Sequence, residues 1–161
     1  MVAGPDDGAG PATAHLQERR RQAHRLVADL TRWAVDEPGV HALVLVGSYA
    51  HGRERVASDV DLVLLTDGPA PLSPTGGWFE RLRPGSRLVR TAAFGPVREQ
   101  RHRLPCGLVA EVGVAPVAWA DVPLDAGTRR VLADGHRVLH DPHGALARAA
   151  AALREAGPPR T

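Results

Sequence analysis

Residues 43–65 read LVLVGSYAHGRERVASDVDLVLL, and this stretch decides the fold. An apolar run of strand length ends at Gly47-Ser48, and a second begins at Asp59-Val60-Asp61 after ten intervening residues. Residues two apart on a strand point to the same face, roughly 6.5–7 Å apart along it, so Asp59 and Asp61 share one face. The stretch therefore predicts two buried strands joined by a turn and loop, with two carboxylates presented together.

These two carboxylates predict a site for divalent cations. Charges on an otherwise apolar strand are costly unless a cation compensates them. Mg²⁺ prefers a few carboxylates together with phosphate oxygens and water, and two such ions can bridge a nucleophile and departing phosphates. The alternative is that Asp59 and Asp61 lie at a solvated strand end.

Gly47-Ser48 has the features of a phosphate-binding turn. Gly47 lets the backbone approach phosphate without a Cβ, and Ser48 would begin a short helix over residues 48–52, where free amides favour an anion. A simple N-cap serine after a turn glycine is the alternative. Arg53 and Arg55 could reach the same phosphates bidentately, or lie in a solvated loop.

Working outward, periodicity and breaker residues predict a mixed α/β sheet with helices mainly on one face. Thr13 is the expected cap of the first helix. A single domain is expected over residues 13–156, between a disordered tail at 1–12 and a short tail at 157–161. The helices are expected over residues 13–36, 48–52, 78–82, 128–133 and 143–155, and the strands over residues 40–46, 59–66, 87–94, 97–104, 108–115 and 137–139.

Composition narrows the functional class. The 161 residues carry a net charge of +2 with 4% aromatic residues, which disfavours a basic, base-stacking nucleic-acid surface. Lys, Ile and Asn are absent while Ala, Gly and Arg abound, as in bacterial proteins from GC-rich genomes. The single cysteine, Cys106, excludes an intrachain disulfide, and neither a membrane span nor a secretory segment is evident. A cytoplasmic location is therefore expected.

The Gly-Ser-x10-Asp-x-Asp pattern of Gly47, Ser48, Asp59 and Asp61 resembles the nucleotidyltransferase superfamily that includes DNA polymerase beta, especially its small bacterial members and the aminoglycoside nucleotidyltransferases. The resemblance covers about residues 40–115. It implies a palm-like mixed sheet of about five strands, two Mg²⁺ ions held by the Asp pair, and a triphosphate held by the matching Gly and Ser. It also implies a third carboxylate on a later strand, for which Glu111 is the best match. Glu111 would bind metal or accept a proton; pairing with an arginine of residues 97–103 is the alternative.

The resemblance implies transfer of a nucleoside monophosphate, most readily AMP from ATP, to a hydroxyl with release of pyrophosphate. The acceptor could be a small molecule, in a pocket completed by a homodimer because few residues follow Glu111. It could instead be a partner protein, as for small antitoxins that adenylylate a helical toxin. A non-catalytic binding module is the rival from another class, and nucleic-acid polymerisation is disfavoured because 161 residues leave no room for further modules.

Three other groups of residues are weaker candidates. Arg98, Arg101 and Arg103 could contact substrate, or lie on an exposed sheet face. The histidines lack the spacing of a zinc site, and Cys106 lacks a neighbouring base. The rings of Trp33, Trp78 and Trp119 are expected to pack in the core, although one could stack on a nucleobase.

Overall fold

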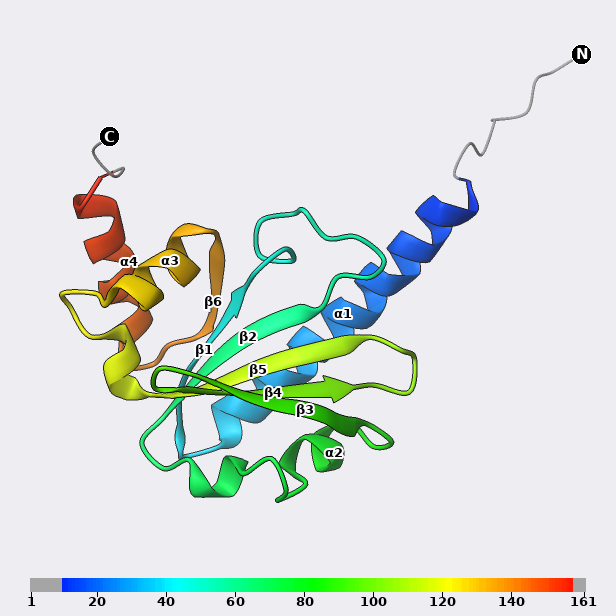
Figure 1. Cartoon of the computed structure of the whole chain (residues 1–161), viewed down its shortest axis with the longest axis horizontal. Helices are drawn as coiled ribbons and strands as arrows, with labels where there is room; N and C mark the ends of the chain where they lie inside the picture. Colours follow the sequence, from blue (N-terminus) through cyan, green and yellow to red (C-terminus); the bar gives the residue numbers. More distant parts are fainter. Residues whose placement is uncertain (1–9, 158–161) are drawn as a thin grey trace, which may run out of the picture.

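One mixed sheet organises the chain, as Figure 1 shows for residues 10–157, the part that this computed structural model describes. Within these residues six strands lie in the order β3-β4-β5-β2-β1-β6. β2 and β5 run parallel, and the other four pairings are antiparallel. The strands are β1 (Val40–Val46), β2 (Val60–Thr66), β3 (Arg87–Phe94), β4 (Val97–Arg103), β5 (Val109–Pro116) and β6 (His136–His140). The predicted mixed α/β class is confirmed, with six strands in place of about five.

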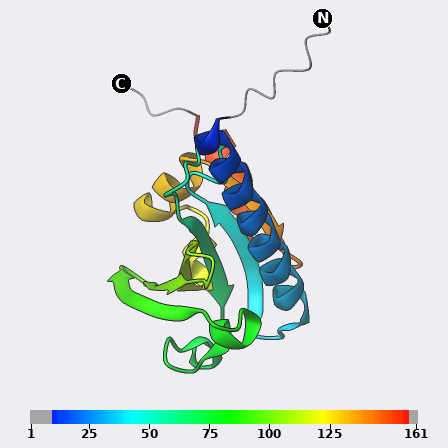
Figure 2. The same cartoon turned by 90° about the vertical axis from the view of Figure 1, so that its right-hand side faces the viewer.

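Helices cover both faces of the sheet, which differs from the prediction that they lie mainly on one. The long helix α1 (Pro11–Asp36) and the short α2 (Trp78–Leu82) share one core with one face of β1, β2 and β5. A second core joins the opposite face to η2 (Val117–Ala120), α3 (Ala126–Ala133) and α4 (Ala145–Glu155). Figure 2 shows α1 and α3 on opposite sides of the sheet. Two covers are needed because successive residues of β1 and β2 are apolar and face opposite ways.

The starts of two helices show how local chemistry sets their bounds. α1 begins at Pro11, so the predicted cap at Thr13 is wrong; proline tolerates the first helical position because its missing N–H would have no partner there. α4 is anchored by Asp141, whose carboxylate accepts from the backbone N–H groups of Leu146 (3.2 Å) and Ala147 (2.9 Å). The predicted opening near Asp141 therefore holds, although the helix itself starts at Ala145.

The predicted helix over residues 48–52 is wrong. These residues form successive turns, with Ala50 N donating to Gly47 O and Arg53 N donating to Ser48 O, both at 3.0 Å. Gly47 and Gly52 both adopt positive φ, at 71° and 72°, which interrupts any helical run between them. A loop rather than a helix terminus thus follows β1.

The ends of the chain and the remaining short element complete the fold. The disordered tail predicted over residues 1–12 is wrong at residues 10–12, which cap or begin α1. The rest of that tail, residues 1–9, lies outside the described residues, as do residues 158–161 of the tail predicted over 157–161. The short helix η1 (Ala70–Leu72) lies in the predicted loop between β2 and α2. Between residues 10 and 157, no helix combines the length and apolar character required to cross a bilayer.

Candidate active site

The close approach of β1 to β2 requires glycine at position 47. Val46, the last residue of β1, pairs with Asp61 of β2. A Cβ added to Gly47 would lie 2.2 Å from Asp61 Oδ2, far inside any normal contact, and the φ of 71° is also unfavourable for other residues. Gly47 therefore makes room for the Asp61 carboxylate at the end of β1.

Three carboxylates meet beside this glycine. Asp61 is directly opposite Glu111 in the parallel pairing of β2 with β5, and neighbouring strands lie about 4.8 Å apart. Asp59 precedes the first residue of β2 and is two positions from Asp61, as the alternation of a strand requires. Asp59, Asp61 and Glu111 thus lie on the face that α3 and α4 cover farther along the sheet, and the predicted convergence is present in the structure.

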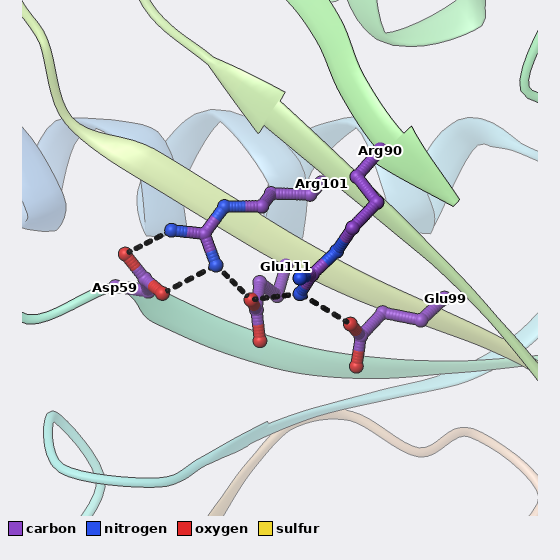
Figure 3. Close-up of polar contacts among 5 residues, drawn as sticks. All are labelled: Asp59, Arg90, Glu99, Arg101 and Glu111. Carbon is purple, nitrogen blue, oxygen red and sulfur yellow. Dashed lines mark hydrogen bonds and ion pairs between the residues drawn. The ribbon is translucent and has the colours of Figure 1, made fainter. Parts of the chain in front are cut away.

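Two arginines reach into this cluster from the neighbouring strands (Figure 3). Arg101 of β4 lies opposite Glu111 and forms an ion pair with it, and its Nη1 is 3.1 Å from Asp59 Oδ2. Arg90 of β3 places Nη2 3.8 Å from Glu111 Oε1 and 4.0 Å from Glu99 Oε1. Glu111 therefore meets the alternative expectation as well, because it pairs with an arginine of β4 while lying beside Asp61.

The electrostatics show a surplus of negative charge. Burial, followed by the charge of Glu111 and a hydrogen bond with it, raises the pKa of Asp61 to about 7. Burial also raises the pKa of Asp59 despite the opposing charge of Arg101, and burial and Glu111 raise the pKa of Glu99. The two arginines therefore do not fully compensate the carboxylates.

The three carboxylates are suitable ligands for a divalent cation, but their side chains are not arranged around one metal position. Carboxylate oxygens are the donors that Mg²⁺ prefers, and Asp61 is held unfavourably in its charged form until a cation approaches. Across residues 10–157, however, no three His, Cys, Asp or Glu side chains are already arranged as ligands around one metal position. Arg101 lies between Asp59 and Glu111 and pairs with both.

A cavity of about 840 Å³ opens beside the carboxylates, within the size range of small-molecule sites. Gly47, Asp61 and Glu111 line one part of it, and Val97 of β4 and Trp119 of η2 line another. A second cavity of about 860 Å³ shares part of this wall and extends toward the start of α3. The shared residues are Phe94, Val97, Trp119, Arg130 and Val131.

Comparison of the sequence with protein-family models identifies a known domain in this chain. Residues 30–107 match the family model described as "Nucleotidyltransferase domain". The chain carries a nucleotidyltransferase domain. No curated protein sequence matches the chain.

The nucleotidyltransferase match contains part of the site. Gly47, Asp59, Asp61 and Arg101 fall within residues 30–107, whereas Glu111 lies four residues beyond. The third carboxylate thus reaches the site through the sheet, by the pairing of β5 with β2, rather than through the matched segment.

The other predicted nucleotide-binding residues lie in the loop of the nucleotidyltransferase domain that follows Gly47. Ser48 is half-buried, and Arg53 and Arg55 are exposed. Among the described residues, neither arginine side chain forms an ion pair or a hydrogen bond; the backbone N–H of Arg55 donates to Ser58 Oγ at 2.8 Å. The structure therefore leaves both arginines outside the carboxylate cluster.

The sequence interpretation missed Arg90 and the residues that line the cavity beside the carboxylates. Arg90 pairs with Arg101 in the β3–β4 hairpin, so strand alternation could have placed it on the same face as Glu99. Trp119 is the tryptophan that lines the site cavity, while Trp33 and Trp78 stack in the opposite core with ring centroids 4.9 Å apart. Only the course of the chain after β5 places Trp119 there.

Proposed function

We propose that this chain is a Mg²⁺-dependent nucleotidyltransferase that transfers a nucleoside monophosphate, most readily AMP from ATP, to an acceptor hydroxyl. The observation that carries the proposal is the direct pairing of Asp61 with Glu111, next to a glycine that leaves space for the Asp61 carboxylate. The domain match supports nucleotidyl transfer in general. The nucleotide, the metal and the acceptor are the parts proposed here.

The proposed roles follow from position. Asp59, Asp61 and Glu111 would hold two Mg²⁺ ions, which when bound neutralise charge on the phosphates. Gly47 and Ser48 would contact the β and γ phosphates, and Arg53 and Arg55 would reach the triphosphate from the loop after β1.

The reaction is an in-line displacement at the α phosphorus. The acceptor oxygen forms a bond to phosphorus as the bond to the β phosphate oxygen breaks, and pyrophosphate departs. Glu111 would receive the proton of the attacking hydroxyl, because it borders the cavity in which an acceptor can lie. A homodimer or a partner protein could complete the acceptor side.

The test is direct incubation with candidate substrates. The chain is mixed with each nucleoside triphosphate, Mg²⁺ and candidate acceptors, and the mass added to each acceptor is measured. An added mass of one nucleoside monophosphate, abolished in Asp61→Asn and retained in Asp36→Asn at the exposed end of α1, supports the proposal. Calorimetric titration that detects no nucleotide binding with Mg²⁺ would count against it.

A second candidate function is non-catalytic docking to a partner, as an antitoxin-type module. The observation in its favour is that Arg101 already neutralises part of the carboxylate cluster. The paired change of Asp59 and Asp61 to Asn separates the two functions. A biological effect that survives this double change favours docking, and loss of the effect favours catalysis.

A further inference from the structure

Arg101 occupies the position between two of the three carboxylates. Its Nη1 is 3.1 Å from Asp59 Oδ2, its Nη2 is 3.5 Å from Asp59 Oδ1, and it also pairs with Glu111 (Figure 3). The side chains are sheltered, with exposed fractions of 25% for Arg101, 25% for Asp59 and 20% for Glu111. Such partly buried pairs are screened less by solvent than surface pairs.

These contacts conflict with direct metal binding. Both oxygens of Asp59 face the guanidinium, so a cation that binds Asp59 and Glu111 must displace Arg101 or share its ligands. Asp61 differs, because no arginine pairs with it within residues 10–157 and it lies against Gly47.

We propose that Arg101 is an internal counter-cation that makes metal binding depend on nucleotide. This inference rests on the proposed function. In the protein alone, Arg101 neutralises Asp59 and Glu111 and opposes a second cation by charge repulsion. A bound triphosphate offers the guanidinium another anion with matching bidentate geometry, so Arg101 turns to phosphate and releases the carboxylates to the metal.

Arg90 reduces the electrostatic cost of moving Arg101 away from the carboxylates. Its Nη2 already lies near both Glu111 and Glu99, so these carboxylates keep one cation when Arg101 moves. Metal and nucleotide then favour each other's binding, and linkage requires the enhancement to be equal in both directions. Arg101 is thus a positioning residue that sets the order of loading.

The test measures Mn²⁺ affinity by electron paramagnetic resonance of the free ion. Each protein is titrated alone and with an ATP analogue that cannot be cleaved between the α and β phosphates. The Mn²⁺ that the analogue binds without protein is measured separately and subtracted, because triphosphates themselves chelate the ion. Wild type should bind Mn²⁺ at least about tenfold more tightly with the analogue. Arg101→Gln should bind Mn²⁺ about tenfold more tightly than wild type without the analogue and show a smaller enhancement with it, because one positive charge close to the metal is gone.

Two variants serve as controls. Arg103→Gln removes the same charge from an exposed position two residues along β4, and should bind Mn²⁺ like wild type. Arg101→Lys keeps the charge but loses the planar fork that spans two carboxylates, so its affinity without analogue should lie between wild type and Arg101→Gln. It remains informative if the glutamine variant fails to fold.

The outcomes separate this inference from the proposed function. If the analogue promotes Mn²⁺ binding in wild type but Arg101→Gln and Arg101→Lys match wild type without analogue, the counter-cation role is overturned and the proposed function stands. An equal rise in Arg103→Gln also overturns it, because general charge then explains the effect. If no variant binds Mn²⁺ even with the analogue, both ideas fail together.

Discussion

Replacement of Gly47 by alanine should displace Asp61 and reduce nucleotidyl transfer. The added Cβ would lie 2.2 Å from Asp61 Oδ2, whereas an unstrained carbon–oxygen contact is about 1 Å longer, so the carboxylate must move by about that amount. A misplacement of about 1 Å in a catalytic geometry can lower the rate about 100-fold. We therefore expect the rate of pyrophosphate release by Gly47→Ala to fall about 100-fold.

Gly52 provides a matched control in the same loop. Its φ is 72°, almost identical to that of Gly47, but within residues 10–157 no atom beyond Gly52 and its two chain neighbours lies within 4 Å of its added Cβ. Both alanine variants therefore carry the same backbone cost of roughly 1–2 kcal/mol, measured as a loss in the free energy of unfolding in urea. Only Gly47→Ala should lose the activity in addition.

The assay follows pyrophosphate release at saturating ATP and Mg²⁺, together with urea unfolding of each variant. The reasoning is refuted if Gly47→Ala and Gly52→Ala release pyrophosphate at similar rates. It is also refuted if Gly47→Ala keeps wild-type activity while unfolding more easily, since the contact with Asp61 would then be irrelevant to catalysis.

Further predictions concern pH and buried polar groups. Burial lowers the pKa of His102 to about 4, so between pH 6.5 and 4 the unfolded chain binds more protons than the folded one. The contribution of His102 to the free energy of unfolding should therefore fall by roughly 2–3 kcal/mol between pH 8 and 4.5. In urea titrations at the two pH values, His102→Phe should lose less stability than wild type by about this amount. The pH dependence of stability that Asp61 contributes has the opposite sign. Burial and Glu111 raise its pKa to about 7, so the free energy of unfolding falls as pH rises toward 8. Without metal at pH 8, Asp61→Asn should be more stable than wild type by about 2 kcal/mol in urea unfolding, although inactive; equal stability would contradict the pKa shift. Gln100→Leu should destabilise the protein by about 3 kcal/mol, because Gln100 accepts from Trp78 Nε1 at 3.0 Å and donates to a backbone carbonyl at 2.6 Å in a buried site. Asp141→Ala should lower the thermal midpoint through a loss of about 1 kcal/mol at the start of α4, and an unchanged midpoint would show that this cap contributes nothing.

The sequence was sufficient for the local features that depend on neighbouring residues. The alternation of Asp59, Val60 and Asp61 places both carboxylates on one face, since strand geometry leaves no other arrangement. Gly47 ends β1 in a turn with positive φ, as a glycine after an apolar strand favours. The helix predicted over residues 48–52 does not form, because Gly47 and Gly52 on either side of it adopt positive φ. The segment is also too short for an apolar pattern to distinguish a helix from a turn.

What only the tertiary structure decided is which distant strands become neighbours. Asp61 and Glu111 are 50 positions apart in the sequence, and nothing local specifies that β5 pairs in parallel with β2 at this register. The same register places Arg101 between Asp59 and Glu111, which alternation along β4 alone could not predict. The sequence by itself therefore determined that Asp59 and Asp61 share one face, because this follows from strand periodicity. Glu111 was named only through the family resemblance. The order of strands in the sheet determined which residues lie beside these carboxylates. That order depends on burying both apolar faces of β1 and β2 at once.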